Sequence, residues 1–199
     1  MVVIGLTGKV CAGKDEYARA FGERGALVID MDKLGHQVLE EQHKAISETF
    51  GASLVVDGKV DRGALGAQVF SDQAKLRALE EILHPAMVER TKAIISEAKE
   101  ETVVINAALL KRMGLVELCD RVVFIAAPLW LRYLRCYKRQ NLSIQSFCKR
   151  NRAQKDINPS VFGGNVQLTV FHNRHTTAII HRQVASYCDT MDADVSTKR

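Results

Sequence analysis

The stretch GLTGKVCAGKDEYA, residues 5–18, follows a short apolar run and contains the glycine and lysine spacing of a phosphate-binding loop. Gly8, Gly13 and Lys14 match the pattern G-x-x-x-x-G-K-[ST], but Asp15 stands where the pattern has Ser or Thr. Such a loop, placed between a buried strand and a helix, binds phosphate through the unpaired N–H groups of the helix start. The stretch therefore predicts a strand, a phosphate-binding loop and a helix.

Asp15 changes the electrostatics of this loop. A carboxylate about 4 Å from a phosphate charge is repelled by roughly 4 kcal/mol at an effective dielectric near 20. A divalent ion between the two groups reverses the sign, because Mg²⁺ prefers hard oxygen ligands. Asp15 therefore either binds a metal or points away from the phosphates. Alternatively, Asp15 and Glu16 only favour the helix N-terminus, where acidic residues contribute about 0.3–1 kcal/mol.

Strand-like runs recur along the chain and are separated by helical patterns. They are ALVID (26–30), TVVIN (102–106), RVVFIA (121–126) and QLTVF (167–171). Short apolar strands alternating with helices are typical of a parallel sheet covered on both faces. We therefore expect an α/β fold with three layers, in which five parallel strands lie between helices.

The length of 199 residues favours one domain, residues 1–199, with insertions. After a helix through 36–50 and a turn at Asp57-Gly58, helical stretches at 61–83 and 86–100 break the simple alternation of strands and helices. We expect these stretches to form a helical insert at about 58–100.

Composition places the chain among ordinary globular proteins, with 47% hydrophobic and 26% charged residues. No apolar run approaches the roughly 20 residues that span a bilayer, and no signal-peptide layout is present, so we expect a cytoplasmic protein without a membrane partner. The cysteines are scattered and form no C-x-x-C pair, which predicts reduced thiols rather than disulfides or a zinc site. They are Cys11, Cys119, Cys136, Cys148 and Cys188.

A basic segment at about 138–160 is predicted to form a mobile lid over the triphosphate. From residue 132 to 155 the chain has eight basic residues and no acid: Arg132, Arg135, Lys138, Arg139, Lys149, Arg150, Arg152 and Lys155. A nucleic-acid surface or a plain solvated face are the alternatives. The lid is favoured because the segment has no aromatic stacking platform and because solvated faces usually mix charges.

Asp30 and Asp32 end the second strand in the sequence IDMD. Open α/β sheets bind their ligands at the carboxyl ends of the strands, where a carboxylate can orient a substrate hydroxyl and accept its proton. Alternatively, one of the two acids only caps the helix that begins near Lys33.

Several motifs, in the same order along nearly the whole chain, resemble those of dephospho-coenzyme A kinases. They are GLTG…AGK, VIDMDKLGHQV, FGASLVVDGKVDRGALGAQVF, LHPAM, VVINAALLKRMGL, RCYKRQNLS and VFHN. The resemblance implies a P-loop kinase that phosphorylates the ribose 3′-hydroxyl of dephospho-CoA with ATP and Mg²⁺. Two alternatives stay open: a P-loop kinase of another nucleoside or nucleotide, and a catalytically silent nucleotide-binding homologue. We expect small-molecule substrates, no nucleic acid, and a monomer or weak homo-oligomer.

The resemblance also implies roles for individual residues. The general base falls on Asp32, and Lys14 and Arg139 complete the catalytic set. The acceptor is expected to contact Asp30, Asp61, Arg62 and His84, the last at the start of a helix. The nucleotide is expected to contact Gly8, Cys11, Ala12, Gly13, Lys14, Asp15, Glu16, Arg135 and Asn173, with Asp15 as the metal ligand.

The chain departs from the family pattern at several positions. Cys11 stands where the family favours glycine, and Arg112 stands where it often has an acid. The stretch NPSVFGGNVQ (158–167) also fits the family poorly, and the terminal residues 197–199 are expected to fray.

Overall fold

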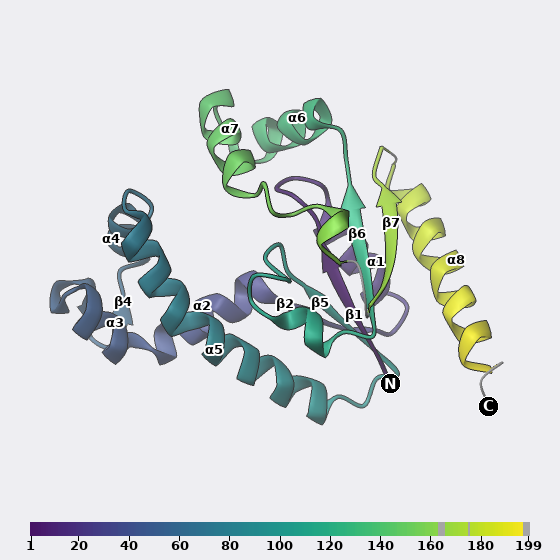
Figure 1. Cartoon of the computed structure of the whole chain (residues 1–199), viewed down its shortest axis with the longest axis horizontal. Helices are drawn as coiled ribbons and strands as arrows, with labels where there is room; N and C mark the ends of the chain where they lie inside the picture. The colour runs from purple at the N-terminus through teal and green to yellow at the C-terminus, as the bar shows by residue number, and fades with distance from the viewer. Residues whose placement is uncertain (163–165, 175, 197–199) are drawn as a thin grey trace. The chain divides into compact units, whose positions relative to one another are not determined.

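The computed structural model describes residues 1–162, 166–174 and 176–196, so parts of NPSVFGGNVQ and the whole of the expected frayed end lie outside the described residues. The chain divides into two compact units (Figure 1). The first unit consists of Met1–Ile29 and Ala98–Arg199, and the second unit is Asp30–Glu97. The second unit contains most of the proposed insert at about 58–100 and also the preceding residues from 30 onward.

The first unit is built on a five-stranded sheet with the order β2-β5-β1-β6-β7. Its strands are β1 (Val2–Thr7), β2 (Leu27–Asp30), β5 (Thr102–Asn106), β6 (Arg121–Ala126) and β7 (Gln167–His172). The central strand β1 pairs in parallel with both neighbours, so that Leu6 lies opposite Asn106 on β5 and Val123 on β6. The carboxyl end of β1, where the phosphate-binding loop begins, therefore lies between two other strand ends.

Helices α1 (Lys14–Gly22) and α8 (Thr177–Ser196) cover one face of this sheet (Figure 1). The core between them contains apolar side chains from both sheet and helices: Ile4, Leu6, Tyr17, Phe21, Ile180 and Val184. On the other face of β1, Leu110 and Cys119 lie next to Gly5. In the sequence, Leu110 precedes the short helix η2 (Leu115–Leu118) and Cys119 follows it. The predicted fold class, a three-layer α/β fold with five parallel strands, is confirmed.

The second unit contains helices and one small hairpin. Its elements are α2 (Met31–Glu41), α3 (His43–Phe50), η1 (Ala52–Leu54), β3 (Val55–Val56), β4 (Lys59–Val60), α4 (Arg62–Val69) and α5 (Gln73–Glu97). The predicted turn at Asp57-Gly58 connects β3 and β4, and both residues have positive φ angles, 50° and 73°, as tight hairpin turns require. A separate apolar core, which includes Leu39, Ile46 and Phe50, stabilises the unit.

The predicted helix boundaries in this unit are partly wrong. The expected helix through 36–50 is interrupted at Gln42, between α2 and α3. The expected helix at 61–83 is interrupted after Phe70, because Asp72 caps a new helix by accepting hydrogen bonds from Ala74 N and Lys75 N. No break occurs at Pro85, which lies inside α5. His84 is therefore within a helix rather than at its start.

Two helices, α6 (Leu129–Gln140) and α7 (Ile144–Ala153), form a basic hairpin that contains most of the predicted lid. Pro128 precedes α6, and Ser143 caps α7 by accepting a hydrogen bond from Ser146 N. Helix α7 ends at Ala153 and is followed by η3 (Pro159–Phe162). Among the described helices, none has the length and apolar character needed to cross a membrane.

The prediction that all cysteines are reduced thiols is wrong. Cys11 of the phosphate-binding loop and Cys136 of α6 form a disulfide, with a Cα–Cα distance of 5.7 Å. Cys119, Cys148 and Cys188 are not part of this disulfide. The sequence spacing could not reveal this pair, because the two residues are separated by 125 positions and are brought together only by the fold.

Replacement of both Cys11 and Cys136 by Ser should lower the free energy of unfolding by about 2–4 kcal/mol, because the disulfide restricts a long segment of the unfolded chain. Chemical denaturation under non-reducing conditions measures this difference. Replacement of the exposed free Cys148 by Ser is the control and should leave the midpoint unchanged. Equal stability of the double variant and the wild type would contradict a constraining role for the disulfide.

Candidate active site

The phosphate-binding loop depends on two glycines at points of close approach. A Cβ atom at Gly8 would lie 2.5 Å from the carbonyl oxygen of Ile125, and one at Gly13 would overlap the side-chain amide of Asn173. Gly13 also has a φ of 95°, a conformation that L side chains rarely adopt. The loop therefore packs against the ends of β6 and β7 in a way that larger residues would prevent.

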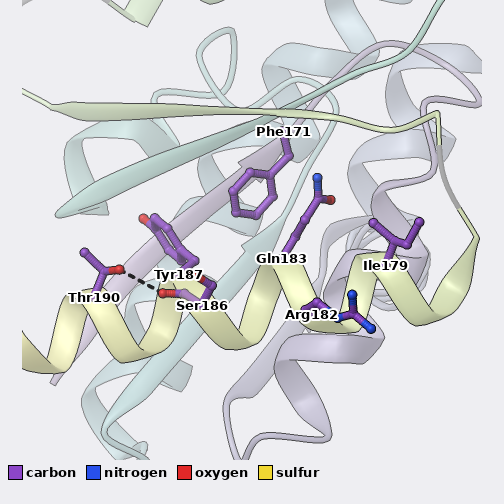
Figure 2. A pocket seen from close by; sticks show the side chains of 7 residues that line it. All are labelled: Phe171, Ile179, Arg182, Gln183, Ser186, Tyr187 and Thr190. Carbon is purple, nitrogen blue, oxygen red and sulfur yellow. Dashed lines mark hydrogen bonds between the residues drawn. The ribbon is translucent and has the colours of Figure 1, made fainter.

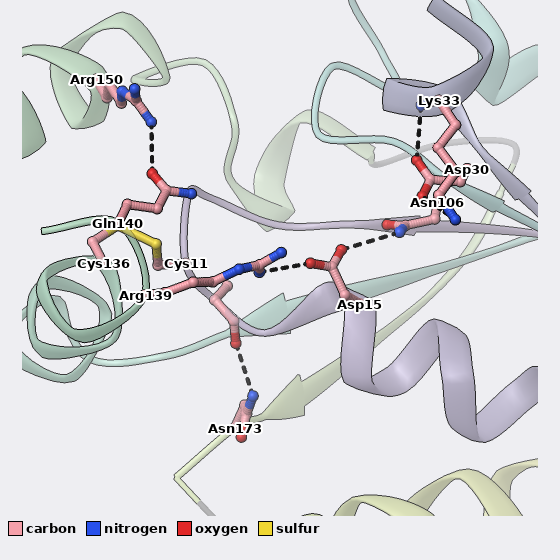
Figure 3. A network of polar contacts seen from close by, with 11 residues as sticks. Cys11, Asp15, Asp30, Lys33, Asn106, Cys136, Arg139, Gln140, Arg150 and Asn173 are labelled. Carbon is pink, nitrogen blue, oxygen red and sulfur yellow. Dashed lines mark hydrogen bonds and ion pairs between the residues drawn. A yellow bond between two sulfur atoms is a disulfide. The ribbon is translucent and has the colours of Figure 1, made fainter. Parts of the chain in front are cut away.

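Cys11 adopts a left-handed conformation with a φ of 56°, where glycine is favoured. The disulfide to Cys136 holds this residue against α6 (Figure 3). A side chain is therefore accommodated in a conformation suited to glycine, and its sulfur connects the loop to the basic hairpin.

The carbonyl oxygen of Ala12 is held by two side chains from distant parts of the chain. Asn173 Nδ2 donates to it over 2.8 Å, and Arg135 Nη1 donates to it over 3.2 Å. Arg135 Nη2 also donates to Asn173 Oδ1 over 3.1 Å. Since Asn173 is only 1% exposed, this network fixes the loop backbone from inside.

The basic hairpin makes further contacts with the loop through Val10. Gln154, directly after α7, accepts a hydrogen bond from Val10 N over 2.7 Å, and Arg132 donates to Val10 O over 3.4 Å. Arg132 is 5% exposed, donates to Asn151 on α7 and lies over the ring of Phe147. Arg132 therefore holds the hairpin and the loop together.

Asp15 lies in the first turn of α1 between a cation and an amide (Figure 3). Its Oδ2 pairs with Arg139 Nη1 at 2.9 Å, and its Oδ1 accepts a hydrogen bond from Asn106 Nδ2 at 3.3 Å. Burial tends to raise the pKa of Asp15, but these hydrogen bonds and the charges of Lys14 and Arg139 outweigh burial and hold it below its usual value. Asp15 is therefore an ionised carboxylate at the mouth of the loop.

The partner of Asp15 is weakly held. The side chains of Asp15 and Arg139 are 58% and 70% exposed, and an exposed ion pair of this kind contributes only about 0–1 kcal/mol. The paired carboxylate raises the pKa of Arg139, so the guanidinium stays charged. Arg139 can therefore leave Asp15 for another anion at little cost.

The remaining predicted loop residues differ in their surroundings. Lys14 begins α1 and is close enough to Asp15 to lower its pKa. Glu16 points toward the helix surface, where it pairs with Arg19 at 2.6 Å. Glu16 therefore has the arrangement expected of an acid that supports the helix start.

In the second unit, Asp30 and Asp61 have structural hydrogen bonds. Asp30 caps α2 by accepting from Asp32 N at 3.0 Å and from Lys33 N at 3.2 Å, which is the capping alternative considered for the IDMD motif. Asp61 caps α4 by accepting from Ala64 N at 3.0 Å. Each cap uses one carboxylate oxygen.

The other predicted acceptor residues of this unit lie on three helices. Asp32 is exposed in the first turn of α2, next to its cap. Arg62 begins α4, with its Nε 3.9 Å from Glu40 Oε1. His84 is half-buried within α5.

Two hollows differ in their relation to the loop. One of about 510 Å³ lies between β7 and α8 and contains none of the predicted site residues (Figure 2). The other, of about 230 Å³, is lined by Lys9 of the loop and Arg132 of α6, together with residues from the end of β6. The second hollow is therefore the one that adjoins the phosphate-binding loop.

Three residues that contact the loop were missed by sequence reasoning: Asn106, Arg132 and Gln154. Asn106 could have been found, because it ends a strand at the sheet edge where Asp30 was noticed. Arg132 was counted only as part of the basic segment, and Gln154 carries no sequence signal. Their contacts depend on how the hairpin folds back onto the loop.

The described residues contain no group of three or more His, Cys, Asp or Glu side chains that could hold a metal ion by themselves. A site built from one carboxylate and substrate phosphates matches the usual coordination of Mg²⁺ rather than that of Zn²⁺ or Ca²⁺. Asp15 is the acid at the phosphate-binding loop that could serve such a site.

Comparison with known proteins agrees with this geometry. The family model described as "Dephospho-CoA kinase" matches residues 2–166. A dephospho-CoA kinase from Aquifex aeolicus is 36% identical over 163 residues, which is 79% of this chain and 83% of that protein. One from Borreliella burgdorferi is 33% identical over 159 residues, 78% of each chain.

A crystal structure from Thermus thermophilus superposes with a TM-score of 0.80 at 27% identity and covers 96% of this chain and 97% of its own. The dephospho-CoA kinase structure from Campylobacter jejuni shares the fold, with a TM-score of 0.62 at 21% identity. The superposition covers 94% of this chain and 96% of that one. These matches agree with the phosphate-binding loop, the strand order of the sheet and the order of the motifs along the chain. The chain belongs to the dephospho-CoA kinase family.

Proposed function

We propose that this chain transfers the terminal phosphoryl group of ATP to the ribose 3′-hydroxyl of dephospho-CoA, the last step of coenzyme A synthesis. The observation that carries the proposal is the family match over residues 2–166, which spans the phosphate-binding loop, the IDMD motif and the whole basic hairpin. It favours this reaction over a kinase of another nucleoside or nucleotide and over a silent homologue.

The phosphates of ATP are proposed to bind the loop amides and Lys14. Gly8, Cys11, Ala12 and Gly13 shape this loop, and Asn173 and Arg135 support it through the Ala12 carbonyl. Because phosphoryl transfer depends mainly on positioning and charge neutralisation, a loop held rigidly in this way would need little rearrangement when the nucleotide binds.

Asp15 is proposed as the protein ligand of Mg²⁺. Its carboxylate is ionised and lies at the loop, and the buried oxygen of the neighbouring Asn106 has no hydrogen-bond partner within the described residues. These oxygens fit a hard cation. Mg²⁺ bound there would offset the negative charge of the phosphates.

Asp32 is proposed to accept the proton of the 3′-hydroxyl, and Asp30 to fix the start of α2 and thereby the direction of Asp32. Asp61, Arg62 and His84 are proposed to contact the acceptor from the insert at about 58–100. The segment at about 138–160 is proposed to act as the lid, from which Arg139 exchanges Asp15 for the transferred phosphoryl group. We further propose a monomer or weak homo-oligomer in the cytoplasm.

The cytoplasmic proposal bears on the disulfide. Disulfides are rare in cytosolic proteins, where thiols are mostly kept reduced. Quantitative alkylation of the protein in freshly lysed cells, followed by mass spectrometry of the Cys11 and Cys136 peptides, would measure how much of the pair is oxidised in its natural environment.

The reaction is tested with purified protein, ATP and Mg²⁺ and a panel of acceptors. Dephospho-CoA should yield coenzyme A and one equivalent of ADP, measured by liquid chromatography. Deoxyadenosine, shikimate and gluconate serve as competing acceptors. Preferred phosphorylation of one of these would make the protein a different kinase, and ATP binding without turnover would identify a silent homologue.

Replacement of Asp32 by Asn should reduce kcat on dephospho-CoA by at least about 100-fold, because general base catalysis contributes about 10²–10⁴-fold. ATP affinity, measured by calorimetry, should change little. Glu41, an exposed acid at the other end of α2, is the matched control, and Glu41→Gln should retain activity. Near-normal turnover of Asp32→Asn would remove Asp32 from this role.

Replacement of Arg139 by Met should lower kcat by on the order of 10³-fold, as expected when an arginine that stabilises the transferred phosphoryl group is lost. Arg24→Met is the control, because Arg24 forms an exposed ion pair of the same length, 2.9 Å, with Asp189. Both variants should melt near the wild-type temperature. A similar loss of activity in the two variants would point to a general effect of surface charge instead.

A further inference from the structure

The side chain of Asn106 is buried beside Asp15 and only half of its amide is used. Asn106 is the last residue of β5 and is 8% exposed. Its Nδ2 donates to Asp15 Oδ1 over 3.3 Å, whereas its Oδ1 is inaccessible to solvent and has no hydrogen-bond partner among the described residues (Figure 3). A buried acceptor left unpaired is costly unless an ion, water or ligand satisfies it.

The orientation of this amide follows from the chemistry of its neighbour. An ionised carboxylate only accepts hydrogen bonds, so the amide nitrogen of Asn106 must face Asp15. The amide oxygen is therefore not used by Asp15 and is left as a neutral oxygen close to an ionised one. Together the two residues present one charged and one neutral oxygen donor at the ends of α1 and β5.

P-loop phosphotransferases of the Walker type commonly hold Mg²⁺ with two groups. One is the neutral hydroxyl of the residue that follows the loop lysine, and the other is an acid of the Walker B segment on a neighbouring strand. In this chain the residue after Lys14 is the acid Asp15, and the residue at the end of the neighbouring strand β5 is the neutral Asn106. The same two kinds of group are present in exchanged positions.

We propose that Asp15 and Asn106 form a single cation-binding pair in which the acidic and the neutral member have traded places. Asn106 is the positioning residue: its nitrogen orients the Asp15 carboxylate, and its oxygen is offered to the cation or to a water bound to it. The inference rests on the proposed nucleotide site and extends it, since it explains how a loop without its hydroxyl keeps a complete ligand set.

Charge explains why the two positions must change together. Two carboxylates at this distance repel each other and favour protonation of one of them, whereas two neutral groups leave the cation without a charged ligand. One acid in either position satisfies both requirements. The pair therefore predicts that an acid at position 106 compensates for the loss of the acid at position 15.

Binding of Mn²⁺ to the complex of the enzyme with ADP tests this prediction without any acceptor substrate. Electron paramagnetic resonance measures free Mn²⁺ for the wild type, Asp15→Ser, Asn106→Leu and the double variant Asp15→Ser/Asn106→Asp. Asp15→Ser and Asn106→Leu should each weaken Mn²⁺ binding on the order of 10-fold or more. The Mn²⁺ affinity of the double variant should return to within about threefold of that of the wild type. If the two positions acted independently, the two losses would add instead.

A second double variant, Asp15→Ser/Asn141→Asp, controls for the simple restoration of charge. Asn141 is exposed after α6 and has a left-handed conformation, with a φ of 49°, that Asp tolerates. This variant should bind Mn²⁺ as weakly as Asp15→Ser. Equal rescue by both double variants would reduce the effect to net charge and overturn the proposed pair.

Metal-free measurements separate folding from metal binding. Melting temperature and ADP affinity in EDTA are recorded for every variant. The proposed pair is refuted if Asp15→Ser/Asn106→Asp folds and binds ADP but binds Mn²⁺ no better than Asp15→Ser does. It is also refuted if Asp15→Ser binds Mn²⁺ as tightly as the wild type does. Since dephospho-CoA is absent, these outcomes are independent of whether the proposed transfer reaction is correct.

Discussion

The structure of the nucleotide site depends on the way in which the carbonyl oxygen of Ala12 is held. Asn173 and Arg135, which are 161 and 123 residues away in sequence, both donate hydrogen bonds to it. A buried backbone carbonyl without such partners would be costly. These two hydrogen bonds therefore join the loop to the end of β7 and to α6, and they hold the Ala12 carbonyl toward the protein interior.

The basic hairpin adds contacts at the neighbouring residues of the loop. Gln154 accepts from the amide of Val10, and Cys136 is bonded to Cys11. The hairpin is consequently part of the loop's support, and it also carries Arg139, which pairs with Asp15. Arg132 is buried and Arg135 is partly buried, and burial lowers the pKa of both, whereas Arg139 at the end of α6 is exposed. Burial thus distinguishes the two arginines that support the loop from Arg139.

Asp15 shows how an acid can occupy a phosphate-binding loop. Lys14 and Arg139 place positive charge around it, and Asn106 donates a hydrogen bond to it. The loop thereby retains an ionised carboxylate without leaving it unpaired. The cost of an acid near phosphate is reduced by the same cations that would bind the nucleotide.

Local sequence patterns were sufficient for the elements whose signals lie within a few residues. The apolar runs predicted all five strands of the sheet, and Asp57-Gly58 predicted the hairpin turn because only a few residue types adopt two consecutive positive φ angles. Proline at position 85 was misleading, since the local penalty of proline in a helix was outweighed by the packing of α5 on both sides of it. Asp72, which does begin that helix, had the residue type of a cap but was overlooked.

The sequence by itself determined the class of fold, the phosphate-binding loop and the family, because each rests on spacing along the chain. The tertiary structure alone decided which residues surround the loop: the disulfide between Cys11 and Cys136, the buried Arg132, and Asn106 beside Asp15. These partners are 91 to 125 residues apart in the chain, and no local pattern encodes a distance between them. Their proximity results from parallel strands ending at one edge of a sheet and from a helical hairpin that folds back over that edge.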